Sequence, residues 1–112
     1  MYKNERDDFA AAVFEIAKLI PPGRVTSYGA IARAAGGPGL SRMVGCIMAK
    51  CGEDIPAHRV LNSQGELSAR RAFGPGDEME KLLEAEGVVV RNNRIKDWKH
   101  VFWDPLTEIG II

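Results

Sequence analysis

Residues 26–50 read TSYGAIARAAGGPGLSRMVGCIMAK, and this stretch predicts two short helices joined by a tight turn. Thr26 or Ser27 supplies the oxygen that caps the first helix, whose apolar residues follow at helical spacing. The glycines of residues 36–39 form the turn, and the second helix is expected over residues 41–50. Two helices joined in this way indicate a helix-turn-helix, with a purely structural helical hairpin as the alternative.

Helical patterns also flank this stretch on both sides. An amphipathic helix is expected over residues 4–20, with Asn4 as its cap. Residues 52–77 are rich in loop residues, and residues 77–86 are expected to form a helix that ends at Gly87. Three apolar residues of that last helix are predicted to face the core: Met79, Leu82 and Leu83.

The C-terminal part of the sequence predicts a small amount of strand. A hairpin is expected over residues 88–95, with its turn at Asn92 and Asn93. The tail carries three aromatic residues that we expect to pack back on the body: Trp98, Phe102 and Trp103. The predicted fold class is therefore mainly α with minor β.

Composition narrows the possible functions. A length of 112 residues favours one domain over residues 1–112. The 15 basic and 15 acidic residues cancel, which argues against a strongly cationic, non-specific nucleic-acid binder but leaves room for a local basic patch. Two cysteines are too few for a disulfide framework, and the sequence contains neither a membrane span nor a signal peptide. We therefore expect a soluble cytoplasmic protein.

Few residues stand out as candidates for chemistry. His58 follows Pro56 in the loop-rich part, and Glu86 could hydrogen-bond it, but a Glu–His pair without a neighbouring nucleophile orients groups and does not react. Cys46 and Cys51 do not share a helix face, and no pair of ligands has the spacing of a metal site. We expect no metal and no cofactor.

Two further segments could contact nucleic acid. The helix over residues 41–50 presents small residues and one long cation, Arg42, which suits a narrow groove. The basic stretch of residues 68–71 is either solvated surface charge or a clamp for a phosphate or a base face.

The segment Ile55-Pro56-Ala57-His58-Arg59-Val60 resembles the I-P-C-H-R-V signature of the O6-alkylguanine-DNA alkyltransferases. The similarity extends from about residue 13 to residue 87. It includes, in the family's order, residues 25–28 (VTSY), 41–45 (SRMVG), 62–65 (NSQG) and 82–87 (LLEAEG). This resemblance implies a winged-helix-like helix-turn-helix DNA-binding domain of the alkyltransferase C-terminal type.

One departure from the family pattern decides the expected function. The family's acceptor cysteine falls on Ala57, whose methyl group has no lone pair to attack an alkyl group. The sequence thus resembles the alkyltransferase-like proteins, in which that cysteine is replaced. The resemblance implies a non-enzymatic, monomeric sensor that flips O6-alkylguanine out of double-stranded DNA and passes the lesion to nucleotide excision repair proteins.

The resemblance also assigns roles to individual residues. Tyr28 resembles the tyrosine that presses on the phosphate 3′ of the lesion, Arg42 the arginine that fills the gap in the base stack, and Arg70 an arginine that lies against the alkylated base. The residues expected to bind DNA and flip the base are Thr26, Ser27, Tyr28, Ser41, Arg42 and Gly45. The lesion pocket is expected to contain Tyr28, Pro56, Ala57, His58, Val60, Ser68 and Arg70. A supporting network is expected to join His58, Glu86 and Asn62.

Other departures leave alternatives open. The segment between Arg42 and Ala57 is about two residues shorter than in the alkyltransferases, their asparagine hinge has no counterpart in residues 50–52, and their glycine-rich loop is replaced by residues 67–71. The first alternative is an active alkyltransferase that uses Cys46 or Cys51. The others are a helix-turn-helix transcription regulator and a scaffold that has lost its DNA function.

Overall fold

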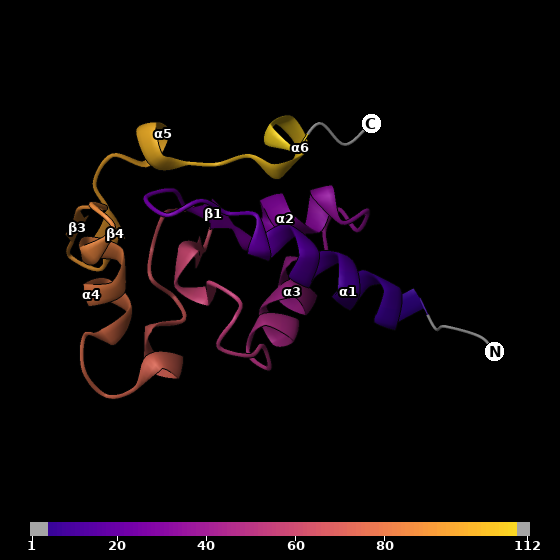
Figure 1. Ribbon diagram of the computed structural model, residues 1–112, viewed down its shortest axis with the longest axis horizontal. Helices are drawn as coiled ribbons and strands as arrows, with labels where there is room; N and C mark the ends of the chain where they lie inside the picture. The colour runs from indigo at the N-terminus through magenta and orange to yellow at the C-terminus, as the bar shows by residue number, and fades with distance from the viewer. Residues whose placement is uncertain (1–4, 110–112) are drawn as a thin grey trace.

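A computed structural model describes residues 5–109 of the chain, and within them the predicted mainly α fold with minor β is confirmed (Figure 1). In chain order the elements are α1 (Glu5–Lys18), β1 (Thr26–Ser27), α2 (Tyr28–Ala34), α3 (Ser41–Met48), the 3₁₀ helix η1 (Ala57–Arg59), β2 (Val60–Leu61), the 3₁₀ helix η2 (Arg70–Phe73), α4 (Glu78–Ala85), β3 (Val90–Arg91), β4 (Arg94–Ile95), α5 (Trp98–Val101) and α6 (Pro105–Glu108). None of the helices in this range is long and apolar enough to cross a membrane.

The helix pair α2–α3 forms as its sequence predicts. Ser27 caps α2, because its Oγ accepts a hydrogen bond of 3.0 Å from the backbone N–H of Ala30. Gly36 and Gly39 of the turn have φ values of +89° and +87°, a left-handed conformation that glycine adopts without a steric penalty. The second helix ends at Met48, two residues earlier than predicted.

A short parallel strand pair, absent from the sequence-based prediction, joins the two halves of the molecule. Thr26 pairs with Val60 and Ser27 with Leu61. Successive strand residues point to opposite faces, so Val60 enters one hydrophobic cluster and Leu61 the other. The first cluster fills the space between α1, α2 and α3, and includes Val13, Ile31, Val44 and Ile47. The second lies against α4 and the β3–β4 hairpin, and includes Met79, Leu83, Val88 and Ile95.

The predicted hairpin and the predicted packing of the tail are both confirmed. Asn92 and Asn93 have φ values of 51° and 62°, the two left-handed residues that a tight hairpin turn needs. The tail crosses back over β1, where the Val25 N–H donates to Val101 O (2.9 Å) and the Trp103 N–H donates to Val25 O (2.7 Å). Trp103 is buried, and the half-buried rings of Trp98 and Phe102 stack with centroids 5.1 Å apart.

Two expectations for the helices are not confirmed. Leu82 was expected in the core but is 44% exposed, because the buried face of α4 is occupied by Met79 and Leu83, which lie one turn apart. The predicted cap Asn4 lies outside the described residues.

Removing either of the two neighbouring hydroxyls of β1 should change the free energy of unfolding, and the two changes should have opposite signs. Thr26 is fully buried, and its Oγ1 has no hydrogen-bond partner among the described residues, whereas Ser27 caps α2. Thr26→Val keeps the side chain's shape and removes an unpaired buried hydroxyl, so we expect the free energy of unfolding to rise by about 1 kcal/mol. Ser27→Ala should lower it by about 1 kcal/mol. Urea denaturation of both variants measures the changes, and a destabilised Thr26→Val protein would show that this hydroxyl has a partner.

Candidate functional site

A cleft of about 790 Å³ opens between the helix-turn-helix and the loop-rich part of the chain. Its walls combine members of both hydrophobic clusters, with Tyr28 and Ala57 from the first and Ala69 and Phe73 from the second. Further lining comes from α3 (Gly45, Met48, Ala49), from residues 51–59 and from Ala72, with Lys18 and Leu82 at the edges. Leu82 on α4 is therefore exposed because it forms part of the cleft wall.

The cleft brings together five residues that the sequence predicted for the site: Tyr28, Gly45, Pro56, Ala57 and His58. Tyr28 begins α2 and is half-buried. Burial raises the pKa of the Tyr28 phenol above its ordinary value of 10.0, a hydrogen bond with the Ser68 side chain opposes this rise, and Cys51 adds to it. The phenol therefore stays protonated at neutral pH and can donate a hydrogen bond. Ser68 lies beside it but does not line the cleft.

Ala57 lines the cleft at the first position of η1. Its N–H donates to Ile55 O (2.8 Å), and the next residue, His58, is held by Glu86. Cys46 is exposed on α3 outside the lining, while Cys51 lies in the cleft. Burial raises the pKa of the Cys51 thiol, its backbone hydrogen bond lowers it, and Asp54 raises it further. Cys51 is thus a neutral thiol rather than an activated nucleophile.

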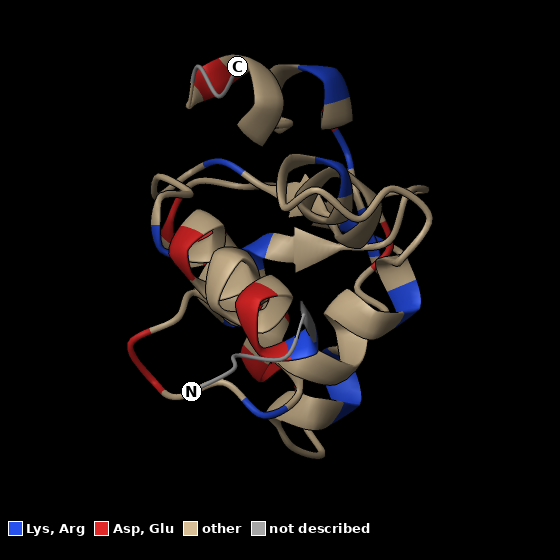
Figure 2. Ribbon diagram, turned by 90° about the vertical axis from the view of Figure 1, so that its right-hand side faces the viewer, with Lys and Arg blue, Asp and Glu red and all other residues tan. Residues whose placement is uncertain are grey.

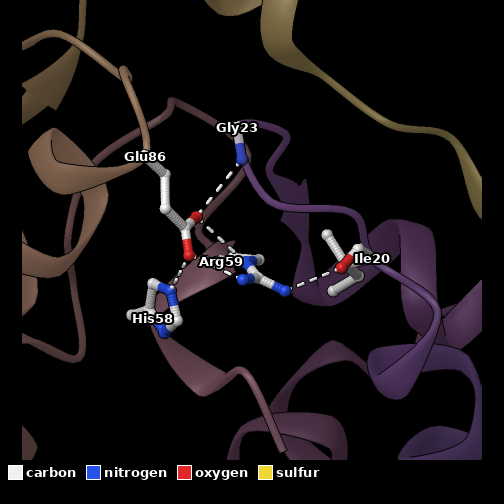
Figure 3. Close-up of polar contacts among 5 residues, drawn as sticks. All are labelled: Ile20, Gly23, His58, Arg59 and Glu86. Atoms are coloured by element: carbon white, nitrogen blue, oxygen red, sulfur yellow. Dashed lines mark hydrogen bonds and ion pairs between the residues drawn. The ribbon is translucent and has the colours of Figure 1, made fainter.

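Glu86, directly after α4, joins segments that are far apart in the sequence (Figure 3). Its Oε2 lies 2.9 Å from His58 Nε2 and 2.6 Å from Arg59 Nη2, and its Oε1 accepts hydrogen bonds from Arg59 Nε (3.0 Å) and the Gly23 N–H (3.3 Å). Arg59 Nη1 also donates to Ile20 O at 2.8 Å. The predicted His58–Glu86 contact is present, and Arg59 and Gly23 extend it to the turn after α1.

These contacts fix the charge state of the network. Burial alone would raise the pKa of Glu86, but hydrogen bonds from Arg59, His58 and the Gly23 N–H outweigh it and lower the pKa to about 2. An ionised carboxylate only accepts hydrogen bonds, so His58 donates from Nε2. The His58 ring is therefore held in one orientation at the edge of the cleft.

The α3 face beside the cleft is open. Ser41 and Arg42 are exposed, and Arg42 makes no hydrogen bond or ion pair with any residue in the range 5–109. A Cβ built on Gly45 would meet no atom within 4 Å, so the glycine leaves space in front of the helix rather than inside the core. In the view of Figure 2 acidic and basic segments are interspersed, so this side of the molecule is not uniformly cationic and any basic contact with DNA is local.

Other predicted site residues lie elsewhere. Thr26 and Ser27 are buried in β1, where the Ser27 hydroxyl caps α2, and Val60 is fully buried and does not line the cleft. Arg70 does not line the cleft, because its guanidinium is held by Asp77 (3.0 Å) and Asn93 (3.2 Å). Asn62 does not join His58 and Glu86: its amide donates to Glu66 (2.9 Å), and its carbonyl oxygen closes the turn at residues 62–66.

Sequence reasoning missed Arg59 and much of the cleft. Arg59 directly precedes the apolar pair Val60-Leu61, and an arginine buried beside such residues requires an acceptor, which is the signal that the sequence offers. The turn of residues 52–55 gave no such signal. Within residues 5–109, no three His, Cys, Asp or Glu side chains gather closely enough to hold a metal ion.

Comparison with known proteins adds three findings. The family model described as "6-O-methylguanine DNA methyltransferase, DNA binding domain" matches residues 8–88. A DNA base-flipping protein of Vibrio parahaemolyticus is 40% identical over 86 residues, covering 75% of this chain and 84% of the relative. Alkyltransferase-like protein 1 of Schizosaccharomyces pombe is 35% identical over 106 residues, covering 88% of this chain and 97% of the relative.

The fold has a match among solved structures as well. The S. pombe alkyltransferase-like protein, crystallised in complex with damaged DNA containing O6-carboxymethylguanine, superimposes with a TM-score of 0.77 at 32% identity. The match covers 92% of this chain and 98% of the other. The predicted alkyltransferase C-terminal type of fold is thereby confirmed.

The Glu86 network predicts a stability loss in acid. The folded-state pKa of about 2 lies below the ordinary 4.5, so the stabilisation is complete above about pH 4.5 and is lost as the pH falls toward 2. At neutral pH this difference corresponds to about 3 kcal/mol. We expect Glu86→Gln to lose roughly this amount and to remove most of the wild-type slope between pH 4.5 and pH 2.

Urea denaturation over this pH range provides the measurement. Glu84→Gln, which changes an exposed glutamate of the same helix, serves as the control and should shift stability by less than about 0.5 kcal/mol. A Glu86→Gln protein with the wild-type pH slope would show that the carboxylate is not held as described.

Proposed function

This chain belongs to the 6-O-methylguanine DNA methyltransferase DNA-binding domain family, and from that premise we propose that it binds DNA carrying an O6-alkylated guanine and keeps the rotated base in the cleft without removing its alkyl group. The observation that carries the proposal is the methyl group of Ala57, which lines the cleft together with Tyr28 and His58. A transferase needs an electron pair at the atom that receives the alkyl group, and a methyl group has none. The cleft therefore accepts a base and offers no acceptor for its substituent.

Binding begins with the helix-turn-helix against the DNA minor groove. Arg42 is exposed on α3 and has no partner in the described chain, so its guanidinium is available to enter the base stack as the nucleotide leaves it. Unstacking costs a few kcal/mol and costs less for a weakened alkylguanine–cytosine pair than for an intact one. This difference gives a first source of selectivity for lesions.

Tyr28 and the cleft then hold the rotated nucleotide. The protonated phenol of Tyr28 presents a hydrogen-bond donor at the start of α2, where a phosphate or a base edge can accept it. Ala57 is small, so the cleft has room for the adduct beside it. Arg70 must release Asp77 and Asn93 before it can lie against the base, a contact that we propose forms only on binding.

The fate of the lesion depends on a second repair system. A complex that transfers no bond leaves the alkylated guanine in the DNA, so another activity has to remove it. We propose that binding bends the duplex and that the bend recruits nucleotide excision repair proteins to the lesion. The proposed partners are thus alkylated double-stranded DNA first and repair proteins second.

An active transferase is the second candidate, because Cys51 lies in the cleft. Its thiol has a raised pKa, and no side-chain hydrogen bond joins it to His58 in the described part of the chain. A neutral thiol without a base is a poor nucleophile. Non-covalent binding is therefore the better-supported function.

The first test compares duplexes that differ only in one base. We expect tighter binding to a duplex with one O6-methylguanine than to the same duplex with guanine, measured by fluorescence anisotropy at several salt concentrations to separate phosphate attraction from base recognition. With a radiolabelled methyl group, all of the label should remain on the DNA. Equal affinities would refute lesion recognition, and label on Cys51 or Cys46 would establish the transferase.

The second test removes the cation of α3. Arg42→Ala should weaken binding to the O6-methylguanine duplex by more than about 1 kcal/mol, roughly fivefold or more, and should weaken binding to the guanine duplex much less. Lys99→Ala, at an exposed cation of α5, is the control for the loss of one positive charge. Equal losses of affinity for both duplexes would show that Arg42 contacts only a phosphate and does not support rotation of the base.

A further inference from the structure

One wall of the cleft carries two carboxylates. The turn of residues 52–55 is closed by a hydrogen bond from the Ile55 N–H to Gly52 O (3.2 Å), and Glu53 and Asp54 at its tip both line the cleft. Asp54 folds back over Gly52, where a Cβ would come within 2.9 Å of its Oδ1. The glycine thereby leaves the space that the Asp54 carboxylate occupies.

The turn lies next to the position where the adduct would sit. Ala57 is three residues after Asp54, a separation that spans at most about 10 Å even in an extended chain. The hydrogen bond from the Ala57 N–H to Ile55 O (2.8 Å) draws the two positions closer. Asp54 also contributes to the raised pKa of Cys51, so its charge is felt at a second side chain of the cleft.

Each positive charge of the lining has an acidic neighbour. Arg59 is paired with Glu86 at 2.6 Å, and His58 donates to the same carboxylate. Lys18, at the edge of the cleft, has Glu15 at 3.8 Å. Neither Glu53 nor Asp54 has an ion-pair partner in the part of the chain that the structure describes, so the turn adds two unpaired negative charges to the lining.

We propose that Glu53 and Asp54 make the cleft select O6-alkylguanines by the charge of the alkyl substituent, favouring neutral and cationic adducts over anionic ones. This inference rests on the proposed function, because it concerns the same cleft and the same base. A unit charge several ångströms from a carboxylate in a solvent-open cleft changes affinity by roughly three- to tenfold. A carboxylate on the adduct would meet two such repulsions, which the single positive charge of Arg70, brought against the base on binding, offsets only in part.

The test uses two adducts of the same shape and different charge. Duplexes with O6-carboxymethylguanine, which is anionic, and O6-carbamoylmethylguanine, which is neutral, are compared with duplexes that contain O6-methylguanine or guanine. We expect the wild-type protein to bind the carbamoylmethyl duplex roughly three- to tenfold more tightly than the carboxymethyl duplex at low salt, with a smaller ratio at high salt.

Two variants test whether the turn of residues 52–55 causes the difference in affinity between the two adducts. The double variant Glu53→Gln/Asp54→Asn keeps the shape of both exposed side chains and should remove most of the difference between the two adducts. Glu108→Gln removes one exposed carboxylate from α6, outside the cleft lining, and should leave the ratio unchanged. All four duplexes have the same backbone, so a general change in attraction to DNA cancels in the ratio.

The outcomes separate this inference from the function on which it rests. If the O6-methylguanine and guanine duplexes bind equally, the proposed function fails and the inference fails with it. If lesion preference holds but the carboxymethyl and carbamoylmethyl duplexes bind equally, only the charge selection is overturned. A wild-type difference that persists in the double variant also overturns it, because the two carboxylates would then not be its cause.

Discussion

The carboxylate of Glu86 is the contact on which the arrangement of the site depends. Burying a carboxylate is costly, and here the cost is offset by charge-assisted hydrogen bonds from Arg59 and His58 and by the N–H of Gly23. These donors belong to η1 and to the turn after α1, while Glu86 follows α4. One side chain thus fastens the second hydrophobic cluster to the first, and it sets the orientation of His58 in the cleft.

The cleft lies between the two hydrophobic clusters, which a very short strand pair joins. Strands β1 and β2 pair over two residues each, and the side chains of Val60 and Leu61 point into different clusters. Such a short strand pair joins the clusters behind the cleft and leaves their front edges apart, with Tyr28 and Ala57 on one side and Ala69 and Phe73 on the other.

Local signals in the sequence were sufficient for α1 to α4, the cap at Ser27 and the turn at Asn92 and Asn93, because each depends on residues a few positions apart, but the short helices α5 and α6 were not predicted. The parallel pair β1–β2 could not be predicted, since its strands are too short to show a period and lie more than thirty residues apart. Motif resemblance correctly grouped Tyr28, Ala57 and His58, yet it misplaced Asn62 and Arg70 in the unbound protein. Their partners, Glu66, Asp77 and Asn93, are set by the local surface and by the approach of the hairpin, which no motif encodes.

A cleft that cannot form a bond with its ligand has to discriminate by contacts alone. On the proposed function the lesion leaves only by dissociation, so differences among adducts enter mainly through the lifetime of the complex. The contacts available for this are the protonated phenol of Tyr28, the small side chain of Ala57 and the charges of residues 52–55. A covalent acceptor reacts with whatever substituent reaches it in the right geometry. With a methyl group at the same place, the proposed function depends on the shape and charge of the surrounding wall, which then determine how long each lesion is held for a second protein.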